Sequence, residues 1–156
     1  MLSFLSIAYL AKSQCDKIYV DIEKGTMNGL GPKASQAEVK AKFPCFTGNS
    51  PDGSKENCGG GVFCNTHDFY FYTGDDFINI RKDFTGTCSI ELLGKTEEQA
   101  MKLLGKSEGE IKDNEGVRYI FFKRKYGCLI IQIDDAGKVG EFFIYAKEPE
   151  VIDICA

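Results

Sequence analysis

The sequence predicts an α+β fold of two tandem repeats, each a helix followed by antiparallel strands, which form one sheet with helices on one face. A helix-start motif occurs twice, at Ser35 and at Thr96, 61 residues apart. Each motif leads into strands rich in aromatic and β-branched residues, the types that favour a pleated sheet. We therefore expect a first repeat with a Cys-rich loop over residues 14–93 and a second repeat over residues 94–156.

The two predicted helices begin at capping boxes of the pattern S/T-x-x-E/Q, which are Ser35 to Glu38 and Thr96 to Gln99. In this motif the cap hydroxyl accepts from the backbone N–H three residues on, and the acidic or amide side chain accepts from the cap's own N–H. Pro44 and Gly105 are helix breakers that end the two helices, the first of which is predicted over 36–42.

The predicted strands come from alternating apolar residues bounded by turn signals. They are 17–23, 67–72, 77–81, 87–93, 117–125, 129–134 and 138–146. Residues 25–32 form a turn-rich segment before the first helix, and residues 47–61 form a loop of low core potential after it. The short connections between strands imply antiparallel neighbours.

The second copy carries a family resemblance. Residues 94–107 read G-K-T-E-E-Q-A-M-K-L-L-G-K-S, which resembles the repeat opening G-x-T-x-x-Q-V-x-x-L-L-G-x-P of the small outer-membrane lipoproteins of the SmpA/OmlA type. Relatives of that family include secreted β-lactamase-inhibitor proteins, which contain two tandem copies. Residues 134–139 resemble the family's D-x-x-G-K-V hairpin, and the resemblance covers residues 30–146.

The chain departs from that pattern at several points. Ala100 stands where Val is usual and Ser107 where Pro is usual, and the first copy lacks the closing Gly and has a long Cys-rich insert. The resemblance implies either an inhibitor that blocks a partner enzyme or toxin, or a structural component of the cell envelope.

Seven cysteines predict disulfides in an oxidising compartment, because such a density with a signal-like start is typical of exported proteins. They are Cys15, Cys45, Cys58, Cys64, Cys88, Cys128 and Cys155. We expect at least two bridges, one of them within residues 45–64, where a cross-link constrains a loop that loses much entropy on ordering. The cysteines nearest the two ends, at positions 15 and 155, are candidates to join each other.

The N-terminus predicts a secreted or periplasmic protein. Residues 2–11 are almost wholly apolar, and Ala11 and Ser13 are small residues before Gln14, so residues 1–13 resemble a signal peptide with a truncated start. The stretch is too short to span a membrane. The alternative is a buried N-terminal helix or strand. Membrane association is expected only if Cys15 is lipidated, which Gln14 disfavours because a small residue is expected before a lipidated cysteine.

The overall charge argues against a nucleic-acid partner. The chain of 156 residues has a net charge of −4 and a sequence pI near 5.1, so it offers no basic footprint for phosphate groups. One short basic run, at 123–125, is typical of a solvated hairpin end.

The strands have apolar residues on both faces, which predicts a second functional surface. One set is aliphatic and suits the core beneath the helices. The opposing set is aromatic with polar residues interspersed, and it comprises Tyr70, Tyr72, Asn79, Arg81, Tyr119, Phe121, Gln132, Phe143 and Tyr145. Tyr and Arg are enriched at protein interfaces, so we predict that this face binds a protein partner. The alternatives are cross-strand pairing that stabilises the sheet, or a face covered by the Cys loop and the termini.

Candidate catalytic and metal-binding residues are few. His67 is the one histidine, and with Cys64 and Asp68 it could form a thiolate–imidazole pair if Cys64 is free. Cys58, Cys64 and His67 could supply three metal ligands, but their spacing matches no closed zinc site. We therefore expect no enzyme activity, no metal and no cofactor. The predicted function is a secreted or periplasmic, non-catalytic protein-binding module of the inhibitor or immunity type, with a structural cell-envelope protein as the alternative.

Overall fold

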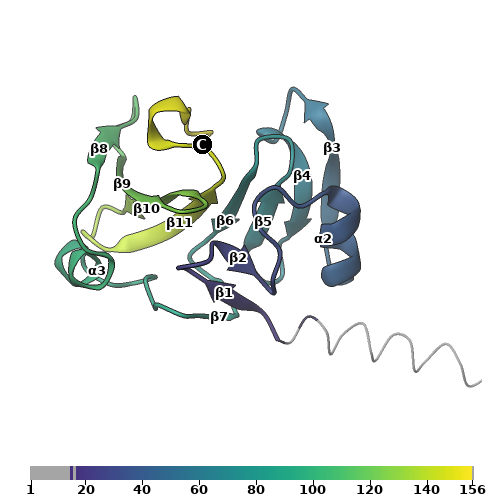
Figure 1. The fold of residues 1–156 in the computed structure, drawn as a ribbon, viewed down its shortest axis with the longest axis horizontal. Helices are drawn as coiled ribbons and strands as arrows, with labels where there is room; N and C mark the ends of the chain where they lie inside the picture. The colour runs from purple at the N-terminus through teal and green to yellow at the C-terminus, as the bar shows by residue number, and fades with distance from the viewer. Residues whose placement is uncertain (1–14, 16, 156) are drawn as a thin grey trace, which may run out of the picture.

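The computed structural model describes Cys15 and residues 17–155, and it has a mixed α+β fold (Figure 1). In this described part of the chain, two short α-helices accompany an eight-stranded antiparallel sheet and a three-stranded sheet. The predicted class is therefore confirmed. The proposed signal peptide at residues 1–13 lies outside the described residues.

The large sheet contains two runs of four strands that meet at its centre. Its order is β3 (Gly48–Ser54), β4 (Gly59–Cys64), β5 (Phe69–Tyr72), β6 (Phe77–Ile80), β11 (Val139–Tyr145), β10 (Gly127–Ile133), β9 (Arg118–Arg124) and β8 (Gly109–Lys112). The run β3–β6 follows the first helix and the run β8–β11 follows the second. Strands β6 and β11 form the seam, where Phe77 pairs with Tyr145 and Ile80 pairs with Phe142.

Both helices begin as the sequence predicts. Helix α2 (Gln36–Lys42) starts at Ser35, whose hydroxyl accepts from the Glu38 N–H at 3.2 Å while the Glu38 carboxylate accepts from the Ser35 N–H at 2.7 Å. Helix α3 (Glu97–Leu104) starts at Thr96, which makes the same reciprocal pair with Gln99 at 3.2 and 3.0 Å. Each box satisfies two backbone donors that a helix start otherwise leaves free.

The main core lies between the large sheet and the helices. Val39 and Phe43 at α2, and Ala100 and Leu104 of α3, belong to one buried cluster with the aliphatic strand residues. Phe43 also meets the ring of Phe69 edge-on, with centroids 4.9 Å apart. In Figure 1 both helices lie on the same side of the curved sheet as strands β1 and β2, which agrees with this shared cluster.

The small sheet differs from the prediction. It has the order β2 (Thr26–Met27), β1 (Tyr19–Asp21) and β7 (Thr87–Cys88), with β1 and β7 parallel. The strand predicted over 87–93 is wrong beyond Cys88, because the chain turns inward there. Ser89 accepts from the Ile22 N–H through its hydroxyl at 2.9 Å, and Leu92 is fully buried.

The predicted loop at 47–61 is also wrong, since it contains β3 and the start of β4. Strand β3 lies at the edge of the sheet, and most of its side chains are exposed. It is held by backbone hydrogen bonds, so its sequence does not need the alternation of apolar residues by which a strand is predicted. Pro51 is tolerated because an edge strand needs donors on one side only. Glycine is required at Gly61, where a Cβ would collide with the backbone of Phe71. The exposed edge strand β8 was missed for the same reason.

Two disulfides are present, and their pairing corrects the prediction. Cys45 pairs with Cys15, and Cys58 pairs with Cys155, so no bridge lies within 45–64 and the two terminal cysteines do not join each other. Among the described residues Cys64, Cys88 and Cys128 are free. Two disulfides suggest an oxidising, extracytoplasmic environment. No helix in the described part of the chain is long and apolar enough to cross a membrane.

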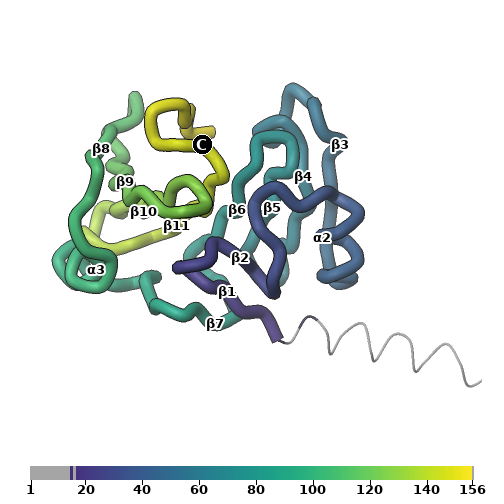
Figure 2. Tube along the Cα trace, in the orientation of Figure 1, coloured from purple at the N-terminus to yellow at the C-terminus, as the bar shows by residue number. Residues whose placement is uncertain are grey.

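The second bridge holds the C-terminal segment, residues 147–155, against the other face of the sheet. This segment includes the short helix η1 (Pro149–Val151), and its Ile152, Ile154 and Cys155 pack against a second buried cluster. Figure 2 shows the segment on the side of the sheet opposite β1 and α3, between the β8–β9 arm and the β3–β4 arm. The sheet is therefore covered on both faces, but only in part on this one.

Candidate functional site

The aromatic face predicted to bind a partner is half covered. Its buried cluster contains Phe77, Tyr119, Phe121, Cys128, Ile130, Phe143 and Tyr145. Among the nine predicted contact residues, the rings of Tyr119, Phe121, Phe143 and Tyr145 are 5% exposed or less. The expectation of an open face is wrong at these four positions, because the C-terminal segment folds over the cluster and the Cys58–Cys155 bridge holds it there.

The remaining predicted contact residues lie toward the seam and the first strand run. Tyr70, Tyr72 and Gln132 are partly exposed, and Arg81 is exposed. Asn79 is buried at 5% exposure. The Arg81 guanidinium lies 5.4 Å from the centroid of the Tyr70 ring, a cation–π contact that holds both side chains near the surface.

An open groove of about 510 Å³ occupies the uncovered part of this face. Six of the nine predicted residues line it, namely Tyr72, Asn79, Arg81, Tyr119, Gln132 and Phe143. These side chains come from β5, β6, β9, β10 and β11 and from Arg81 directly after β6, so the groove crosses the β6–β11 seam. Its other walls are the turn between β3 and β4, the turn between β8 and β9, and the Cys58–Cys155 bridge.

The charged centre of the groove is Glu141, which the sequence prediction missed. Its carboxylate accepts from the Asn79 side-chain amide at 3.2 Å and lies 3.6 Å from Arg81 Nε. Burial raises the pKa of Glu141, although the Asn79 hydrogen bond and the Arg81 charge act in the opposite direction. A signal was available, because Glu141 precedes Phe143 and Tyr145 at the two-residue spacing that puts side chains on one face of a strand.

The rim of the groove has charges of both signs. Lys55 stands on one wall, and Asp113 and Glu115 stand on the opposite arm of the sheet. Arg81 and Glu141 lie between these walls. Within the described residues no histidine and no free thiol lines the groove, since both cysteines there are bridged. The arrangement offers hydrogen-bond donors, acceptors and aromatic walls rather than a nucleophile with a base.

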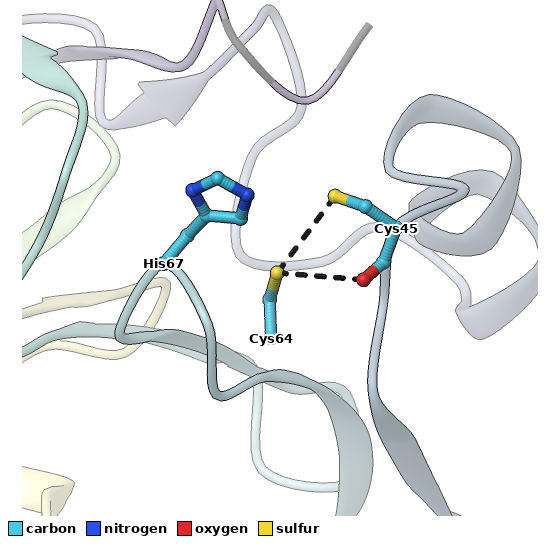
Figure 3. Close-up of side chains that lie close together, drawn as sticks. All are labelled: Cys45, Cys64 and His67. Carbon is cyan, nitrogen blue, oxygen red and sulfur yellow. Dashed lines mark hydrogen bonds between the residues drawn. The ribbon is translucent and has the colours of Figure 1, made fainter. Parts of the chain in front are cut away.

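The candidate catalytic residues lie elsewhere, on the helix-covered side. Cys64 is free and 1% exposed, and its thiol belongs to a cluster with Cys45 and His67 whose ligand atoms all lie within 4.8 Å of one another (Figure 3). Burial raises the pKa of the Cys64 thiol. Asp68 does not complete a catalytic set here, because its carboxylate accepts from the Tyr70 hydroxyl and from the Asp83 N–H.

This cluster does not make the metal site considered from the sequence. Cys58 is bonded to Cys155, so it is not a ligand beside Cys64 and His67. Cys45, and not Cys58, lies beside Cys64 and His67, but its sulfur is bonded to Cys15 and offers no thiolate. Two free ligands remain, fewer than the three or four protein ligands of zinc sites.

Comparison of the chain with protein-family models, with curated proteins and with solved structures finds no match. The resemblance to the SmpA/OmlA type of lipoprotein and to the inhibitor proteins therefore stays a prediction from the motif.

Proposed function

We propose that this chain is an exported, non-catalytic protein-binding module of the inhibitor or immunity type, which receives a polar loop of a partner protein in the groove on its second sheet face. The observation that carries the proposal is the groove itself, which brings Arg81 and Glu141 together with the aromatic side chains that line it. Interfaces of this kind combine aromatic and Arg anchors with a polar rim.

The proposal includes a two-repeat architecture. Capping boxes start both helices at an offset of 61 residues, and each helix is followed by four antiparallel strands. The last strands of the two runs, β6 and β11, pair with each other, and the groove crosses this pair, which is the junction that a duplicated unit would form. A duplicated unit supplies a wide, continuous sheet, and the shared seam gives a site that neither repeat has alone.

The groove chemistry favours a folded partner with charged loop side chains. Arg81 is an accessible cation at the centre of the groove, with a side chain 52% exposed, and its contact with Glu141 at 3.6 Å is long enough to be exchanged for a partner carboxylate. Asp113 and Glu115 on the rim suit a basic group on the same loop. An exported enzyme or toxin is the partner class that the motif resemblance implies.

The alternative, a structural cell-envelope lipoprotein, requires lipid on Cys15. A thioether to lipid and a disulfide cannot share one sulfur, and Cys15 Sγ is bonded to Cys45. The disulfide therefore favours the soluble binding module over the lipid-anchored component.

The test is a capture experiment with groove variants. The exported chain is immobilised, partners from the native cell envelope are identified by mass spectrometry, and the affinity of each candidate is measured. We expect Arg81→Ala to lower the affinity for the partner by roughly 30-fold, the loss that corresponds to a hot spot of about 2 kcal/mol. Lys82→Ala is the matched control, because Lys82 is an exposed neighbouring cation that does not line the groove. Equal binding by wild type and Arg81→Ala would contradict the proposal.

A further inference from the structure

A free thiol lies against an existing disulfide on the helix-covered side of the sheet. Cys64, the last residue of β4, has its Sγ 3.8 Å from Sγ of Cys45, which is bonded to Cys15. Figure 3 shows the Cys64 sulfur between His67 and Cys45. A disulfide is cleaved when a thiolate attacks one of its sulfurs directly, so this juxtaposition places a nucleophile beside its target.

We propose that Cys64, Cys45 and Cys15 form an intramolecular thiol–disulfide exchange site. In the step, Cys64 loses its proton and its sulfur bonds to Cys45 Sγ. The bond between Cys45 and Cys15 breaks, and Cys15 leaves as a thiolate that takes up a proton. One disulfide and one thiol are present before and after, so the step needs no external oxidant or reductant.

His67 is placed to carry the proton. One of its ring nitrogens lies within 4.8 Å of both the Cys45 and the Cys64 sulfurs. Its Nδ1 is 2.6 Å from the Thr85 hydroxyl, which fixes the ring and leaves the other nitrogen to exchange a proton with the thiols. His67 and Cys15 line the same cavity of about 200 Å³, so the imidazole can return the proton to the leaving sulfur.

The resting state keeps the bridge on Cys15. Burial raises the pKa of the Cys64 thiol, so the attacking thiolate is scarce and the exchange is slow. After exchange, a Cys45–Cys64 bridge ties the turn after α2 to the end of β4. Cys15, which precedes β1, then has a free thiol and loses its covalent tie to the core. The site thus provides two alternative anchorages for the N-terminal part of the chain.

The experiment traps the released thiol. The oxidised, folded chain is incubated with excess N-ethylmaleimide at neutral pH, quenched with acid, digested without reduction and mapped by mass spectrometry. We expect label to accumulate on Cys15 in the molecules that contain a Cys45–Cys64 bridge. Cys64→Ala and Cys64→Ser should abolish this labelling, and Cys88→Ser is the matched control, because Cys88 is a free thiol outside the cluster.

His67→Gln should slow the labelling of Cys15 by about 100-fold, the usual contribution of a positioned proton acceptor. An unchanged rate would overturn the assignment of the proton to His67. Label on Cys64 with the Cys15–Cys45 bridge intact would overturn the exchange site, and so would equal labelling of Cys15 in wild type and in the two Cys64 variants.

Discussion

Removal of the Cys58–Cys155 bridge should be the most destabilising change to the covalent framework. The paired substitution Cys58→Ser with Cys155→Ser releases the C-terminal segment from the turn between β3 and β4. The reference is the pair Cys15→Ser with Cys45→Ser, which removes the other bridge. Both pairs replace sulfur by oxygen at two positions, so they are matched in chemistry and differ in the length of chain that they set free.

The magnitude follows from the lengths of the loops. The bridges close sequence separations of 97 and 30 residues, for which the chain-entropy relation gives losses of about 4.7 and about 3.6 kcal/mol in the free energy of unfolding. The longer loop costs more because the bridge removes more conformations from the unfolded chain. Release of the C-terminal segment also uncovers the second cluster, which adds lost apolar burial to the larger value.

The assay is urea unfolding of the oxidised proteins, followed by far-UV circular dichroism, with the free energy extrapolated to water. We expect both paired variants to be less stable than wild type and the Cys58/Cys155 variant to be the weaker of the two. A larger loss from the Cys15/Cys45 variant would refute the reasoning, since it would show that the C-terminal segment contributes little to the fold.

Three further predictions concern single side chains. Ser35→Ala and Thr96→Ala should each lower the free energy of unfolding by roughly 0.5–2 kcal/mol in urea melts, since each removes a formed cap; no loss in either would argue against the capping boxes. Tyr145→Phe should leave the free energy of unfolding unchanged or raise it by about 1 kcal/mol, because the buried Tyr145 hydroxyl has no hydrogen-bond partner among the described residues. The control is Tyr19→Phe, which should be neutral because Tyr19 is exposed. Glu141→Gln should become more stable relative to wild type as pH rises from about 4.3 to 7. The raised pKa of Glu141 makes the folded wild type bind more protons than the unfolded chain, so wild type loses stability over this range and the Gln variant does not. A constant difference in the free energy of unfolding between the two proteins would contradict that shift.

The sequence predicted best those elements whose signals are local. The helix starts at Ser35 and Thr96 follow from side chains three residues apart, so a short window contains the whole motif. Strands β9, β10 and β11 were placed to within one or two residues because each contains four consecutive apolar residues that are buried on both faces of the sheet.

The errors share a different cause. Strands β3 and β8 pair at the edges of the sheet through backbone groups, which leave no hydrophobic pattern. The disulfide partners lie 30 and 97 residues apart and depend on the tertiary fold. The same long-range bridge brings the C-terminal segment over Tyr119 and Tyr145, so an alternation pattern could show which face they share but not what covers it.

Most residues on the sheet face of the groove were predicted from the sequence, but the walls of the groove were not. Six of the nine aromatic-face residues line the groove, since the alternation of side chains along β5, β6, β9, β10 and β11 fixes their common face. The groove walls from the turns at β3–β4 and β8–β9 were not predicted, because β3, β4 and β8 were not predicted as strands. In the cluster of Cys45, Cys64 and His67, the last two lie three residues apart and were paired from the sequence, whereas Cys45 comes from a separate segment that only the fold brings to them.

The central claim is that the groove, and not the helix-covered face, receives the partner. Hydrogen–deuterium exchange of the exported chain with and without its captured partner tests this most directly. We predict protection at the groove walls, in residues 55–58 between β3 and β4 and in residues 113–117 between β8 and β9, with no change at α2 or α3. Protection at the two helices and at β1, with the groove walls unchanged, would contradict the account.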